Sequence, residues 1–137
     1  PFVYTEQYPR GLGPTDGEIL AALPEGARRM EKSTFSCCDE AAFEDLLQGT
    51  GRPVPVIFGI ETHICILATV LDLLEQGRKV VLASDACGSR DPLKAERALS
   101  AMTAAGALVV PVESVIYHLM GRSGTAEFKE LLPLFKE

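Results

Sequence analysis

The sequence predicts an α/β fold in which a parallel sheet is covered by helices on both faces. Short runs rich in apolar and β-branched residues alternate along the 137 residues with longer helical segments. Two of these runs are almost purely apolar, which is typical of strands buried on both faces. Strands separated by helices pair in parallel through right-handed crossovers, so functional residues are expected just after the carboxyl ends of the strands.

Five strands are expected, and two of them carry particular constraints. The third and fourth are the apolar runs, and Pro53 and Pro55 restrict the start of the third to an edge-like position. The five runs cover residues 2–5, 28–32, 54–58, 79–84 and 107–111.

Helix start and stop signals lie between these strands. Residues 15–18 (TDGE) have the form of a capping box ahead of residues 19–23. Asp39 is expected to cap a helix over 40–48, Thr62 one over 63–76, and Asp91 one running to residue 105, each closed by a glycine. Two more helices are expected over 114–120 and 125–135.

Length and composition fit one globular domain over residues 1–137. Hydrophobic residues make up 47% and charged residues 23%, which excludes a disordered chain. The net charge of −6 disfavours nucleic acid as a partner, because phosphate contacts need clustered Lys and Arg. No apolar run reaches the ~20 residues that span a bilayer. We therefore expect no membrane partner, an intracellular, cytoplasmic location and four reduced cysteines.

The segment GIETHIC (59–65) is the strongest local signal of chemistry. It places Cys65 in the first turn of a helix that follows a buried strand. Free amides and the helix dipole lower the pKa of a thiol there and can hold an oxyanion. A small cysteine packing a helix against a sheet fits the same pattern, and position alone does not decide between them.

Lys32 is the second candidate, because it ends the second strand at the same edge of the sheet. An ammonium beside a thiol favours the thiolate by charge attraction. A solvated lysine at a strand end is the commoner alternative.

Several separated motifs, in order along the chain, resemble the isochorismatase-like cysteine hydrolases. The motifs are EKSTFS (31–36), GIETHIC (59–65), DLL (72–74) and DACGSR (85–90). The segments YTEQYPRGLG (4–13), ESV (113–115) and FKE (128–130) narrow the resemblance to the isochorismatase domain-containing proteins, some of which carry a ribonuclease label. The resemblance implies a three-layer α/β/α, Rossmann-like fold with six parallel strands, of which five are seen in this sequence.

The resemblance also implies the catalytic residues. Lys32 and Cys65 fall on the positions of the family's lysine and nucleophile. The backbone amides of Glu61 and Cys65 correspond to its oxyanion hole, and the peptide bond between Ile60 and Glu61 is expected to be cis. The family's aspartate ends a central first strand that has no counterpart here, and none of the six aspartates lies in a matching context. We therefore expect an N-terminally truncated domain with a gap at the centre of the sheet.

A nucleophilic cysteine implies a small amide or related acyl compound as the substrate. Glu6, Tyr8, Phe35, Thr62 and His63 are the candidate substrate-binding residues. Glu6, Tyr8 and His63 are equally compatible with solvated positions, and Phe35 with the core. Residues 5–8 lack the family's Asp and His metal ligands, so no metal and no cofactor is expected.

Two other functions stay open. One is a non-catalytic binding or scaffold protein on the same fold. The other is a ribonuclease, which the acidic charge and the lack of a histidine pair disfavour. The resemblance further implies a homo-oligomer, a dimer or larger.

Overall fold

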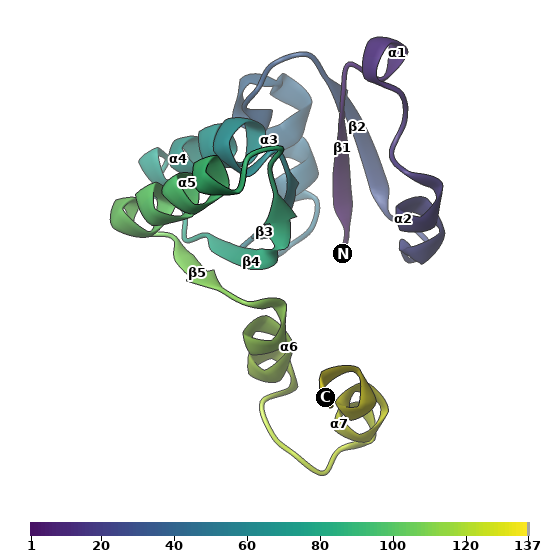
Figure 1. Ribbon diagram of the computed structural model, residues 1–137. Helices are drawn as coiled ribbons and strands as arrows, with labels where there is room; N and C mark the ends of the chain where they lie inside the picture. Colours follow the sequence, from purple (N-terminus) through teal and green to yellow (C-terminus); the bar gives the residue numbers. More distant parts are fainter. Residues whose placement is uncertain (137) are drawn as a thin grey trace.

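The computed structural model describes residues 1–136 and arranges the strands in two parallel sheets (Figure 1). One sheet has the order β1-β2 and the other β3-β4-β5. The described strands are β1 (Val3–Gln7), β2 (Arg28–Lys32), β3 (Val56–Ile60), β4 (Val81–Gly88) and β5 (Leu108–Val110). No strand of the first sheet pairs with a strand of the second among the described residues.

Parallel register brings chemically important residues together at the ends of β1 and β2. The two strands pair from Val3 with Arg28 to Gln7 with Lys32. In the second sheet Val56 pairs with Val81, and the register shifts between Ile57 and Gly59. The carboxyl ends of β1, β2 and β3 lead into the segments that hold the candidate site.

Helices fill the connections between the strands and lie on both sides of the sheets. Figure 1 shows α4 and α5 side by side next to β3 and β4. The described helices are α1 (Pro9–Leu12), α2 (Gly17–Ala22), η1 (Cys37–Asp39), α3 (Ala41–Gln48), η2 (Thr62–Ile66), α4 (Leu67–Glu75), α5 (Pro92–Ala105), α6 (Val112–Met120), α7 (Ala126–Leu131) and η3 (Leu132–Phe135). None of the helices in this part of the chain is long and apolar enough to cross a membrane.

Some expected helix caps are confirmed and others are wrong. Asp91 accepts a hydrogen bond from the amide of Leu93 and Gly106 closes α5, as predicted. The cap of α2 is Asp16, whose side chain accepts from the amide of Glu18, and the amide of Thr15 donates to Glu6. Asp39 lies in η1 and does not cap α3.

The hydrophobic core lies between α4, α5 and the second sheet. Val70, Leu73, Leu82 and Met102 are fully buried there. Met30 of β2 belongs to the same cluster, which connects the two sheets. The amide of Cys37 in η1 also donates to the Thr69 hydroxyl of α4 at 3.0 Å, so the segment after β2 is fixed to the core.

The prediction that the third strand is buried on both faces is wrong. Val56, Phe58 and Ile60 are exposed by 41%, 53% and 76%. They alternate along β3 and so share one face of it. The fourth strand meets the prediction, because its neighbouring residues Leu82 and Ala83 are both buried.

The C-terminal helices form an aromatic cluster of their own. Tyr117 of α6 packs edge-on against Phe128 and Phe135, with ring centroids 6.2 and 5.7 Å apart. Neither α6 nor α7 has a fully covered residue. Figure 1 shows this pair of helices extending away from the strands beyond β5.

Candidate active site

Lys32 is a buried cation at the end of β2, with only 6% of its surface exposed. Its Nζ donates to Gln7 Oε1 at 2.5 Å and to the backbone oxygens of Thr34 and Phe35, each at 2.8 Å. Three acceptors match the three N–H groups of an ammonium. Lys32 is therefore not the solvated lysine that a strand end commonly carries.

Cys65 shares one of these acceptors with Lys32. Its Sγ lies 3.9 Å from Gln7 Oε1, close enough for a weak S–H···O bond. The Cys65 thiol is half-buried, and all four cysteines are free. The fold thus brings Cys65 and Lys32 to one oxygen atom.

Gln7 is the residue that sequence reasoning missed. Its Nε2 donates to the backbone oxygen of Ser33 at 2.9 Å, which turns Oε1 toward Lys32 and Cys65. The available signal was its place just after the expected end of the first strand at residue 5, but its partner Lys32 follows only from the register of β1 and β2.

The segment before Cys65 has an unusual backbone. The Ile60–Glu61 peptide is cis, as the resemblance implied, and Gly59 has a φ of 128°. The amides of Ile64 and Ile66 both donate to the backbone oxygen of Glu61, so the helix begins as the π-type turn η2. Glycine allows the strand to end in this conformation.

Thr62 begins η2 and is fully buried. Its Oγ1 has no hydrogen-bond partner among the described residues, so the prediction that Thr62 caps the helix is wrong. A buried hydroxyl without a partner is costly, and the contact of Thr62 with substrate stays a prediction.

Glu6 is buried and already bound on both carboxylate oxygens. Oε1 accepts from the amide of Thr15 at 2.7 Å, and Oε2 accepts from Arg29 Nε at 2.6 Å. The bond from Thr15, followed by Arg29, lowers the pKa of Glu6 despite burial. These contacts give Glu6 a structural role, and its contact with substrate stays a prediction.

Tyr8 and Phe35 both lie at the surface near Lys32. Their exposed fractions are 57% and 64%. The core position considered for Phe35 is therefore wrong. Tyr8 has a left-handed φ of 41°, and its ring lies so close to Gly11 that a Cβ there would meet it at 2.2 Å.

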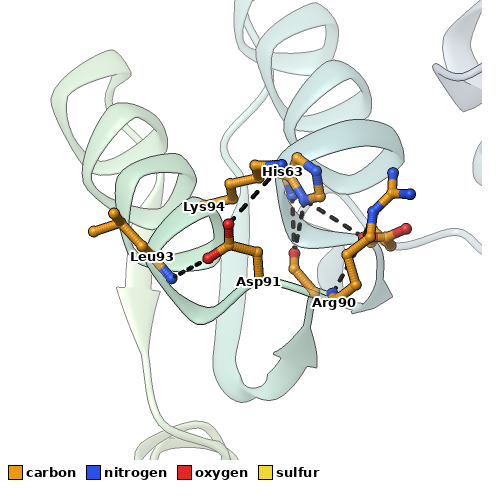
Figure 2. A network of polar contacts seen from close by, with 7 residues as sticks. His63, Arg90, Asp91, Leu93 and Lys94 are labelled. Atoms are coloured by element: carbon orange, nitrogen blue, oxygen red, sulfur yellow. Dashed lines mark hydrogen bonds and ion pairs between the residues drawn. The ribbon is translucent and has the colours of Figure 1, made fainter.

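His63 points toward the loop between β4 and α5 (Figure 2). Its Nδ1 lies 2.9 Å from Ser89 Oγ and 3.6 Å from Glu61 Oε2. Arg90 contacts the same Glu61 oxygen with Nε at 3.3 Å. His63 also lines a groove of about 390 Å³ with residues of α4 and α5, and neither Cys65 nor Lys32 lines it.

Two of the other thiols, those of Cys38 and Cys87, are partly desolvated. Burial raises the pKa of Cys38, and it also raises the pKa of Cys87. Residues 1–136 contain no group of three or more side chains arranged to hold a metal ion.

The parallel α/β architecture and a cysteine–lysine site after two strand ends define the class of an isochorismatase-like hydrolase fold. The sequence model of the protein family described as "Isochorismatase domain" matches residues 1–114. The chain is 41% identical over its whole length to "Isochorismatase domain-containing protein 2" of Pongo abelii. The chain belongs to the isochorismatase family. It spans 65% of the length of that relative.

Solved structures agree with this assignment. "MAR1 Ribonuclease" from Caenorhabditis elegans superposes with a TM-score of 0.89 at 37% identity, over 98% of this chain and 69% of the other. The YcaC gene product of Escherichia coli, described as an octameric hydrolase of unknown specificity, gives 0.75 at 26% identity, over 81% and 55%.

Proposed function

We propose that the chain carries the nucleophile of a cysteine hydrolase that acts on a small amide or related acyl compound. The observation that carries the proposal is the meeting of the Cys65 thiol and the Lys32 ammonium at Gln7 Oε1. A buried cation near a half-buried thiol favours the thiolate, which is the nucleophilic form. Family membership supports hydrolysis as the class of reaction.

In the proposed reaction, the Cys65 sulfur forms a bond to the carbonyl carbon. The carbonyl oxygen becomes an oxyanion, which the amides of Glu61 and Cys65 bind. The carbon–nitrogen bond then breaks, the amine leaves with a proton, and water hydrolyses the thioester to the acid. The ammonium of Lys32 offsets negative charge on the sulfur and the oxyanion.

The proton steps need one more group. By resemblance it is an aspartate, which residues 1–137 do not supply in the matching position. We propose that substrate lies over the half-buried Cys65, within reach of the exposed Tyr8 and Phe35 and of Thr62, while Glu6 and His63 support the walls of the site.

Trapping of the acyl intermediate tests the proposal. The protein is incubated with a panel of small primary amides, and tryptic peptides are examined by mass spectrometry. We expect an acyl adduct on Cys65 and release of ammonia. Cys65→Ala should abolish both, and the matched variant Cys87→Ala should keep both. Ammonia release that survives Cys65→Ala would rule out this mechanism.

The C. elegans neighbour makes ribonuclease activity a second candidate. The net charge of −6 opposes RNA binding, because a basic surface is needed to hold the phosphates. RNA degradation that persists at constant specific activity through repeated purification, and that is lost in Lys32→Met, would favour this candidate over amide hydrolysis.

We also propose that the chain forms a homo-oligomer. Exposed apolar residues on β3 and on the C-terminal helices, among them Phe58, Leu119 and Leu134, offer surface for contact. The octameric YcaC protein provides a precedent in a relative. Sedimentation velocity measures the state directly, and a monomer at all concentrations would contradict the proposal.

A further inference from the structure

One oxygen atom of the candidate site serves two donors. Gln7 Oε1 accepts from Lys32 Nζ at 2.5 Å and lies 3.9 Å from Cys65 Sγ. The other end of the same amide donates to the backbone oxygen of Ser33 at 2.9 Å. The amide is therefore held at both ends, and Oε1 cannot turn away from the sulfur without losing two hydrogen bonds.

The donors of Lys32 are fully used in this arrangement. An ammonium has three N–H groups, and the three acceptors are Gln7 Oε1 and the backbone oxygens of Thr34 and Phe35. No N–H of Lys32 is left to donate to a thiolate. An amide oxygen is only an acceptor, so at this position it stabilises the S–H form of Cys65 over the thiolate.

We propose that Gln7 is a positioning residue that restrains ionisation of Cys65 until a ligand with an N–H donor engages Gln7 Oε1. Engagement of this oxygen frees one N–H of Lys32 for the sulfur, and the thiol proton passes to water. The inference rests on the proposed function, because it assumes that the thiolate is the reactive form. It favours primary and secondary amides over esters as substrates.

Other charged groups surround η2 but do not share an acceptor with Cys65 among the described residues. Glu61 and His63 lie on the same segment, and Arg90 is bound to Glu61. The elements packed against η2 are β3, which has no charged residue, and α4 and α5. The charged residues of these two helices are Asp72, Glu75, Lys94, Glu96 and Arg97. A substitution of Gln7 leaves all of them in place.

The pH dependence of thiol modification tests the restraint. Methyl methanethiosulfonate is a suitable probe because it has no N–H group, and mass spectrometry of peptides isolates the reaction at Cys65. Gln7→Met removes the acceptor and keeps the length of the side chain, so the midpoint of modification should fall by about one pH unit. Gln7→Glu keeps the acceptor and adds negative charge, so the midpoint should rise by a similar amount. The matched variant of an exposed glutamine, Gln48→Met, should leave it unchanged.

Two further variants separate the restraint from a general disturbance of the site. In a Lys32→Met background, Gln7→Met should shift the midpoint much less, because no ammonium is left to be freed. An unchanged or raised midpoint in Gln7→Met would overturn the inference. If Gln7→Met does not fold, an unchanged or lowered midpoint in Gln7→Glu would overturn it. If Cys65 resists modification in every variant, the proposed function itself fails.

A pair of reagents tests the need for an N–H donor. Iodoacetamide and methyl iodoacetate deliver the same carbon, but only the amide can donate to Gln7 Oε1. Relative to free cysteine, the wild-type protein should prefer iodoacetamide several-fold at Cys65, and Gln7→Met should lose the preference. If the wild-type protein and Gln7→Met prefer iodoacetamide equally, the inference that the site favours amides over esters would be contradicted.

Discussion

The ends of β1 and β2 and the loop between β4 and α5 both collect charged side chains, but they hold them differently. Lys32 and Glu6 are buried, and each has two or more close hydrogen-bond partners. In the loop region the side chains of Arg90 and Lys94 are 68% and 55% exposed, and their ion pairs measure 3.3 and 3.9 Å. A buried charged group whose hydrogen bonds are all made is held in one position, whereas the attraction within exposed ion pairs is screened by water.

The largest expected difference between the two regions comes from the two lysines. Lys32→Met should destabilise the protein by about 1–3 kcal/mol, because three part-buried acceptors lose their donor. It should also raise the midpoint of Cys65 modification by about one pH unit. Chemical denaturation and peptide-resolved thiol modification measure the two effects. Lys94→Met is the matched control and should change neither, and equal effects of the two variants would refute the contrast.

A buried hydroxyl and an exposed one give the next largest difference. Thr69→Val removes the acceptor of the buried Cys37 amide and should cost about 1–2 kcal/mol in the free energy of unfolding. Thr103→Val removes a hydroxyl that only bonds back to its own exposed helix, and it should change little. Urea denaturation of both variants measures the two losses in the free energy of unfolding. Similar losses would show that burial of the hydroxyl does not determine the size of the effect.

Glu6 provides a test in pH, with a smaller effect than Thr69→Val. Its pKa lies below the ordinary value of 4.5, chiefly because of the amide of Thr15 and then Arg29. The ionised carboxylate therefore stabilises the folded protein above pH 4.5, and this contribution is lost as the pH falls through the lowered pKa. Thermal unfolding should favour the wild-type protein over Glu6→Gln near pH 7, and the difference should vanish in acid. A constant difference across this range would count against the lowered pKa of Glu6.

The smallest effect is expected in the exposed cluster of Figure 2. Lys94→Ala removes the long contact to Asp91 and should change the free energy of unfolding by less than about 0.5 kcal/mol. Added salt should reduce even this difference. A loss above 1 kcal/mol would mean that this region holds its charges as firmly as Lys32 is held.

Sequence patterns predicted the elements whose signals are local. The limits of α5 follow from Asp91-Pro92 and Gly106, because each acts through its own backbone neighbours. The second strand was predicted with its observed ends, and the other four within a few residues. The motifs also placed Lys32 at the end of its strand and Cys65 after the end of the next one.

Features that depend on distant partners could not be read from the sequence. The apolar run of β3 predicts burial on both faces, but exposure of Val56 and Phe58 depends on what packs over them. Thr62 has the right residue type for a helix cap, yet the π-type turn leaves its hydroxyl without a partner in the described chain. Gln7 gains its role only from pairing with Lys32 across two strands.

The central claim is that Lys32 and the start of η2 make Cys65 the reactive thiol of this chain. The most direct measurement is the rate of modification of all four cysteines in the unaltered protein between pH 5 and 10, resolved by peptide mass spectrometry. Even with the restraint by Gln7 in place, the account predicts that Cys65 reacts at a lower pH than Cys38 and Cys87, whose thiol pKa values are raised by burial. A Cys65 that reacts only together with these two, or after them, would contradict it.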